Sequence, residues 1–116
     1  MSLKRHLRRE RPDAFVCSND SAAAIFRQTL AAAGVRVPTD MMLAGFGDLP
    51  IASLMSPPLT TVRQNTAEMA REAFRLLFSR ISDPKRNPIK ISVASPLVVR
   101  ASTEEYRRLA RKSLKR

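Results

Sequence analysis

The sequence predicts an α/β fold built on a parallel sheet. Two short apolar runs, residues 13–17 (DAFVC) and 41–46 (MMLAGF), have the length and composition of buried strands. Between them, residues 20–33 place apolar side chains three and four positions apart, which is the spacing of one face of a helix. A strand, a helix and a strand in that order predict two parallel strands joined by a right-handed crossover.

The segment after the first helix is expected to be irregular. Gly34 should end the helix, because glycine readily takes the left-handed conformation that stops one. Residues 47–60 form a long connection, since its three prolines exclude a continuous helix and leave room for a single turn at residues 51–55. Residues 60–64 (TTVRQ) have the pattern of a short strand or of a crossing between domains.

The last third of the chain predicts one more long helix. It should cover residues 65–80, with Asn65 or Thr66 as its N-cap. A surface loop follows, and residues 89–100 contain one bent strand or two short ones. Ser102 and Glu105 have the spacing of a capping box, which predicts the start of a final helix.

The positive charge of the chain is concentrated at its two ends. The formal net charge is +11, and residues 1–11 and 104–116 contribute +4 each. We therefore divide the chain into a basic N-terminal segment (1–10) that begins with a vector-like MSL, a nearly neutral folded part (11–103) and a basic C-terminal helix or tail. Solvated tails are the simplest interpretation, although such tails attract nucleic acid at low salt. A small basic nucleic-acid-binding module is therefore one alternative.

Cysteine use and hydropathy predict a cytoplasmic chain without membrane contact. Cys17 is the only cysteine, so no internal disulfide can form, which fits a reducing compartment. No apolar run approaches the roughly 20 residues needed to cross a membrane. The basic N-terminal segment is also not followed by the apolar stretch of a secretory signal.

Catalysis and cofactor binding find little support in the sequence. His6 is the only histidine and lies in the basic N-terminal segment, so a nucleophile–histidine pair in the core is excluded. Cys17 is expected to be a small buried apolar residue. Metal-ligating residues do not cluster, and the three glycines form neither a phosphate-binding nor a dinucleotide-binding motif. We expect no enzyme, no metal and no cofactor.

Asp20 stands where the first strand ends and the first helix begins. In a parallel sheet, ligands bind outside the carboxyl ends of the strands, which is the edge this residue should occupy. A carboxylate there suits a ligand rich in hydroxyl donors, such as a sugar. It also suits a plain N-cap, and the spacing alone favours the cap.

Four segments occur in an order that points to a family. They are PDAFVCSND (12–20), AGVRVPTDMMLAGF (33–46), PPLTTVRQ (57–64) and PLVVRAST (96–103). Together they resemble the C-terminal half of the effector domain of LacI/GalR-type bacterial transcription repressors. The resemblance covers residues 11–103. It implies part of a periplasmic-binding-protein-like (type I) parallel-sheet domain, mostly its C-terminal lobe.

The resemblance also implies an allosteric function and a ligand site. In this family a small effector, usually a sugar or a nucleobase, binds between two lobes and modulates DNA binding. Asp20, in the ND motif, is then expected to hydrogen-bond the effector. Gln64 and Thr66 are expected beside the pocket, and Asn19 is expected to stabilise the turn.

The loop before PPLTT lies at the dimer interface of the family, which makes Leu54 and Met55 the candidates for a homodimer contact. Ordinary core packing is the alternative for both residues. The resemblance further implies that operator DNA is bound by a helix-turn-helix domain absent from this chain, together with most of the first lobe. We therefore expect this chain alone to bind effector weakly or not at all.

Two further expectations follow from the partial coverage. The apolar face of the helix at 65–80 should lack native cover, and open sheet edges tend to pair with another chain. We expect a homodimer or a strand-exchanged oligomer. The segment GFGD departs from the family, because Gly47 stands where an acidic residue is usual. A periplasmic sugar-binding protein of the same fold remains an alternative, and the sequence does not identify the effector.

Overall fold

The computed structural model describes residues 12–104, which fall into two compact units. The first, here called the sheet unit, contains residues 12–63 and 97–104. The second, the helix unit, contains residues 64–96. The chain therefore passes between the units twice, once after residue 63 and once after residue 96.

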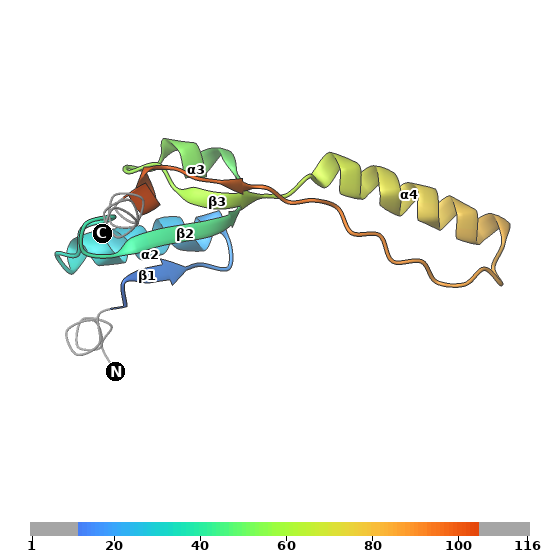
Figure 1. Cartoon of the computed structure of the whole chain (residues 1–116), viewed down its shortest axis with the longest axis horizontal. Coiled ribbons are helices and arrows are strands. Elements are labelled where there is room, and N and C mark those ends of the chain that lie inside the picture. The colour runs from blue at the N-terminus through green and yellow to red at the C-terminus, as the bar shows by residue number, and fades with distance from the viewer. Residues whose placement is uncertain (1–11, 105–116) are drawn as a thin grey trace, which may run out of the picture. The chain divides into compact units, whose positions relative to one another are not determined.

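The sheet unit is built on four strands in the order β1-β2-β3-β4 (Figure 1). These are β1 (Ala14–Val16), β2 (Met42–Gly47), β3 (Thr60–Arg63) and β4 (Leu97–Val98). The first three strands run parallel, which confirms the predicted α/β class, and β4 pairs antiparallel with β3. Residues 89–96 contain no strand, so the predicted strand at 89–100 is reduced to β4.

Helix α2 (Asp20–Ala32) begins and ends at the residues that local chemistry favours. The Asn19 side chain accepts the N–H of the residue three positions later at 2.8 Å, which satisfies one of the free donors of the first turn. At the other end Gly34 has φ +76°, and the Val35 N–H donates to the carbonyl of Leu30 at 2.9 Å. This is the glycine-based helix end that the sequence predicted.

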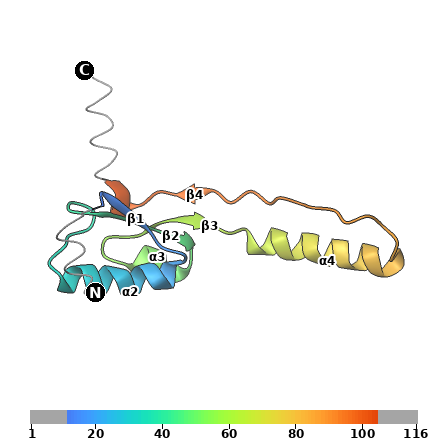
Figure 2. The same cartoon turned by 90° about the horizontal axis from the view of Figure 1, so that it is seen from below.

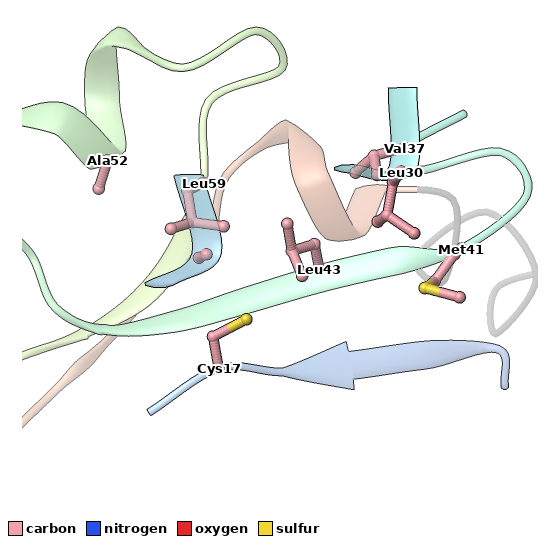
Figure 3. Packing of buried hydrophobic residues seen from close by; sticks show 8 residues of the cluster. Cys17, Leu30, Val37, Met41, Leu43, Ala52 and Leu59 are labelled. Carbon is pink, nitrogen blue, oxygen red and sulfur yellow. The ribbon is translucent and has the colours of Figure 1, made fainter. Parts of the chain in front are cut away.

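The core lies between one face of the sheet and two helices, α2 and α3 (Pro50–Leu54), which lie on the same side of the strands (Figure 2). Helix α3 is the single turn expected in the proline-rich connection. Leu30 of α2, Leu43 of β2 and Leu59 before β3 are fully buried and meet in this layer (Figure 3). The remaining members of the cluster are smaller or lie at its rim: Cys17, Ala23, Val37, Met41 and Ala52.

The prediction that the first strand is buried is wrong. All three residues of β1 are exposed, and 73% of Val16 is accessible. The reason is that β1 lies at the edge of the described sheet and pairs with only one neighbour, β2. Strand β2, also predicted to be buried, is only half-buried: Leu43 and Gly45 are buried, whereas Phe46 is exposed.

The helix unit consists of α4 (Thr66–Ser82) and an irregular return segment. Asn65 is the N-cap, as predicted, and accepts the Glu68 N–H at 3.2 Å. No residue of α4 is buried, which agrees with the expectation that its apolar face lacks cover. The predictions for residues 1–11 and 105–116, including the Glu105 half of the capping box, lie outside the described residues.

We predict that Gly45→Ala destabilises the sheet unit more than Gly34→Ala does. A Cβ on Gly45 would overlap Asp20 Oδ1 and lie 2.8 Å from Leu59 Cδ2. Overpacking together with a displaced buried carboxylate should cost about 3–5 kcal/mol. Gly34 has open space around its Cβ position, so alanine there should cost only about 1–2 kcal/mol of left-handed strain.

Urea unfolding followed by circular dichroism measures both variants. Equal losses at the two positions would show that Gly45 is not packed against Asp20.

Candidate functional site

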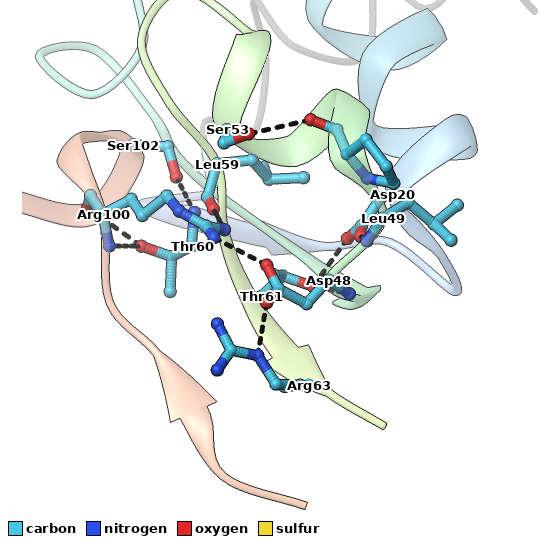
Figure 4. Close-up of polar contacts among 11 residues, drawn as sticks. Asp20, Asp48, Leu49, Ser53, Leu59, Thr60, Thr61, Arg63, Arg100 and Ser102 are labelled. Atoms are coloured by element: carbon cyan, nitrogen blue, oxygen red, sulfur yellow. Dashed lines mark hydrogen bonds and ion pairs between the residues drawn. The ribbon is translucent and has the colours of Figure 1, made fainter. Parts of the chain in front are cut away.

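The carboxyl ends of β1, β2 and β3 place polar residues along one edge of the sheet. Asn19 and Asp20 follow β1, Asp48 follows β2, and Arg63 ends β3. Because these strands are parallel, the three ends meet at the same edge, which is where open α/β sheets bind ligands. Figure 4 shows that the side chains of Asp20, Asp48 and Arg63 lie close to one another there.

Asp20 is an interior anchor of this edge. Its side chain is fully buried. One carboxylate oxygen accepts the Thr61 hydroxyl at 2.6 Å, and the other accepts the backbone N–H of Leu49 at 2.7 Å (Figure 4). The interpretation of Asp20 as the N-cap is therefore wrong, because Asn19 caps α2. The positive end of the helix still favours the Asp20 carboxylate.

Alternation along the strands explains why Thr61 meets Asp20. Gly45 and Thr61 are paired across β2 and β3, so both positions face the side of the sheet that carries α2. The missing side chain at Gly45 leaves the space that the Asp20 carboxylate fills. The three residues thus join the start of α2, the middle of β2 and the middle of β3.

Asp48 forms the second charged cluster of the edge, with Arg63 and Arg100. Its side chain is 8% exposed, and its two oxygens pair with Arg63 Nε and Arg100 Nη2, each at 2.6 Å. The Arg100 guanidinium, and after it that of Arg63, holds the pKa of the Asp48 carboxyl below its ordinary value. Because the pKa is lowered in the folded state, these pairs stabilise the fold above the unfolded-state pKa. The stabilisation is lost as the pH falls through the folded-state pKa.

The predicted effector contacts are divided between the two units. Asp20 belongs to the sheet unit, and Gln64 and Thr66 belong to the helix unit. Gln64 is half-buried and lines a cavity of about 290 Å³ within the helix unit. The other lining residues come from α4 and from the return segment: Met69, Glu72, Ala73, Leu76, Ile91, Val93 and Ser95. Thr66 is exposed at the first turn of α4.

The two predicted dimer contacts have different environments. Leu54 ends α3 and is 80% exposed, which leaves it free to meet a partner. Met55 is half-buried and packs against the core cluster, as the alternative interpretation anticipated. Exposed apolar residues near Leu54 in the sequence are Leu49 and Ile51.

Other kinds of site find no support in the described residues. Residues 12–104 hold no group of three His, Cys, Asp or Glu side chains that could bind a metal. Burial raises the pKa of the Cys17 thiol, which fits an inert packing residue as predicted. In the same part of the chain, no helix combines the length and the apolar character needed to cross a membrane.

Sequence reasoning missed the partners of both carboxylates. Thr61, Arg63 and Arg100 lie in segments that were singled out as motifs, TTVRQ and PLVVRAST, but no role was assigned to them. The signal available was that both motifs place threonine or arginine in or next to a strand. A threonine or arginine that is at least partly buried there needs a polar partner.

Comparison with known proteins agrees with the fold. The family model of the periplasmic binding protein-like domain matches residues 1–103. The HTH-type transcriptional regulator GalR of Lacticaseibacillus casei is 37% identical over 92 residues, which is 79% of this chain and 28% of that protein. The HTH-type transcriptional repressor PurR of Photobacterium profundum is 33% identical over 97 residues, 84% of this chain and 29% of that protein. The chain thus spans less than a third of these curated relatives.

Solved structures give the same result. A transcriptional regulator CelR–cellobiose complex superposes with a TM-score of 0.73 at 36% identity, covering 78% of this chain and 28% of that one. A LacI family transcriptional regulator from Arthrobacter sp. FB24, in complex with lactose, superposes with a TM-score of 0.72 at 30% identity. That match covers 86% of this chain and 38% of the other.

We predict that Asp20→Ala destabilises the sheet unit by about 2–5 kcal/mol, because it leaves the Thr61 hydroxyl and the Leu49 N–H buried without an acceptor. Asp20→Asn should cost less, about 1–3 kcal/mol, since the amide keeps one acceptor oxygen. Denaturant unfolding measures both. Asp13→Asn, at an exposed carboxylate, is the matched control and should stay within about 0.5 kcal/mol of the parent. An Asp20→Ala variant as stable as that control would contradict the anchor role.

Proposed function

The chain belongs to the periplasmic-binding-protein-like domain family of LacI/GalR-type regulators, and from this membership we propose that it is the effector-responsive part of a transcriptional regulator. The observation that carries the proposal is the polar edge at the carboxyl ends of β1, β2 and β3. A buried aspartate holds this edge rigid at the place where the fold binds ligands.

The proposed ligand is a sugar. Structural relatives carry cellobiose or lactose, and sugars present adjacent hydroxyl donors and acceptors. Gln64 supplies both a donor and an acceptor from one amide, and Thr66 is exposed two residues later. Asp20 as a third contact stays a prediction. Its place at the edge supports this contact, whereas its full burial and the two hydrogen bonds that its oxygens already accept within the sheet unit oppose it.

The proposed mechanism is allosteric and involves no catalysis. As in the family that the chain belongs to, an effector bound between the two lobes of the whole regulator would favour one lobe orientation over the other. Only the difference in ligand affinity between two orientations can shift the equilibrium. That shift would change DNA affinity through a helix-turn-helix domain outside these residues, in the cytoplasm. The division of the chain into a basic N-terminal segment (1–10), an effector-binding part that begins at residue 11 and a basic C-terminal part also belongs to this proposal.

The proposed partner is a second copy of the chain. Leu54 is the best candidate contact, because it is a large apolar side chain that the sheet unit leaves exposed. Met55 contributes less, since it already packs against the core. The incomplete cover of β1 and of α4 supports the related proposal of strand exchange between copies.

A chimera tests the regulatory function. In the chimera, the 92 matched residues of L. casei GalR are replaced by the corresponding residues of this chain. GalR supplies the rest of the regulator. We expect the chimera to bind the GalR operator, and at least one of a panel of mono- and disaccharides to change that binding in fluorescence anisotropy. Gln64→Ala should weaken the sugar response about tenfold, as loss of roughly one or two hydrogen bonds predicts.

Asp13→Asn is the control and should leave the sugar response unchanged. A chimera that binds operator but responds to no sugar would overturn the proposal. A chimera that binds a sugar while operator affinity stays constant would favour the alternative, a sugar-binding protein of the same fold.

Light scattering tests the dimer. We expect this chain to have the mass of a dimer or larger, and Leu54→Lys to lower the mass because a charge would be buried in the interface. Leu77→Lys places the same charge on the uncovered helix α4, and Ile25→Lys, at an exposed apolar residue of α2, is the matched control. If Leu77→Lys lowers the mass and Leu54→Lys does not, the interface lies on α4 and the proposal for Leu54 fails.

A further inference from the structure

Asp48 occupies a special backbone position just after β2. Its φ is +54°, in the left-handed region that asparagine and aspartate tolerate better than most residues. Its side chain is nearly buried and paired on both oxygens. The next residue, Leu49, donates its N–H to Asp20, so Asp48 sits directly beside the loop that the buried anchor holds.

Arg100, the more buried partner of Asp48, is fixed from several directions. Its side chain is 19% exposed, and its Nη1 donates to the Leu59 carbonyl at 2.9 Å. The Thr60 hydroxyl accepts the Arg100 N–H at 2.8 Å and lies 2.9 Å from the Arg100 carbonyl. Arg100, which lies outside the β3–β4 ladder, is thereby held to Leu59 and Thr60 by hydrogen bonds that involve side chains.

Side chains matter here because the β4 ladder is short. Strand β4 contains only two residues, Leu97 and Val98, so few backbone hydrogen bonds hold the returning chain. The Ser102 hydroxyl adds another contact, since it accepts the Thr60 N–H at 2.8 Å (Figure 4). It also donates to the Leu43 carbonyl at 2.6 Å. Residues 97–104 are therefore anchored mainly by polar side-chain contacts.

The two arginines mark both points where the chain crosses between units. Arg63 is the last residue of the sheet unit before the first crossing, and Arg100 lies three residues after Leu97, where the chain returns. The parts of the sheet unit next to the two crossings, residues 60–63 and 97–100, are here called the crossing segments. The Asp48 carboxylate therefore pairs with one arginine in each of them. The ion pair of Asp48 with Arg100 should contribute more to stability than the pair with Arg63, because the Arg63 side chain is 57% exposed and exposed pairs contribute little.

We propose that Asp48 is a positioning residue that ties the effector-side loop after β2 to both crossing segments, so that a change in that loop is transmitted to the crossings. The coupling to the effector rests on the proposed function, whereas the mechanical tie does not. Charge-assisted pairs in a nearly buried setting are strong enough for this role. The lowered pKa of Asp48 fits a carboxylate held charged by both partners.

Amide hydrogen exchange of the whole chain, followed by NMR, tests the tie. Asp48→Asn removes the charge and keeps a residue that tolerates a positive φ. We expect exchange at the Leu49 and Arg100 amides to accelerate about tenfold or more, as local opening predicts. The Cys17 amide, which donates to the Ala44 carbonyl at 2.8 Å, should change less than about twofold.

Two arginine variants and a matched control test each ion pair separately. Arg100→Gln should accelerate exchange at the amide of residue 100 as Asp48→Asn does, and Arg63→Gln should accelerate it less. Glu68→Gln removes one carboxylate from an exposed helical ion pair with Arg71 and should leave all these amides unchanged. Uniform acceleration at every amide, Cys17 included, would mean general destabilisation and would overturn the proposal, as would no acceleration at Leu49 or Arg100.

The GalR chimera tests the transmission. Asp48→Asn should weaken the sugar response of operator binding by about tenfold while operator affinity without sugar stays constant. An unchanged sugar response would overturn the transmitting role even if exchange accelerates. A parent chimera without any sugar response would instead overturn the proposed function, and the exchange experiment would still decide the tie.

Discussion

The sheet unit depends on one buried carboxylate. Asp20 accepts a hydroxyl from β3 and a backbone N–H from the loop before α3, while its own backbone begins α2. A buried charge is costly unless its hydrogen bonds are made, so the positions of Thr61 and Leu49 are not free to vary. Gly45 is a consequence of the same constraint, because any side chain there would occupy the space of the carboxylate.

The second carboxylate extends this rigidity to the places where the chain leaves and re-enters the sheet unit. Asp48 directly precedes Leu49, whose N–H donates to Asp20. Its two arginine partners lie next to the two points where the chain crosses between the units. Two acidic residues are thus matched by two basic ones and by neutral donors, which leaves the edge electrically balanced. Such an edge is suited to a neutral, hydroxyl-rich ligand. The charged side chains are already paired, so a ligand would not have to remove water from an unpaired charge when it binds.

Local signals in the sequence predicted most of the fold, whereas contacts between residues far apart in the sequence could not be predicted. Apolar runs, helix periodicity, Gly34 and Asn65 act within a few residues, and the structure agrees with them. The pairing of Asp20 with Thr61 spans 41 positions, and that of Asp48 with Arg100 spans 52. Nothing in spacing or composition relates residues so far apart, so Asp20 was expected at the right edge but without its partners. The exposure of β1 was also missed, because an apolar run does not reveal which faces its neighbours cover.

The two units differ in what holds them together, and this difference bears on how the chain would respond to a ligand. The sheet unit has a buried core and two satisfied carboxylates, whereas no residue of α4 in the helix unit is buried. Local stability follows buried contacts and protected hydrogen bonds, so the sheet unit should open least. A ligand at the polar edge, as proposed, would act on a unit that already holds the chain in place at both crossings. The ligand need not deform the sheet unit, since stabilising one arrangement of the crossings is sufficient.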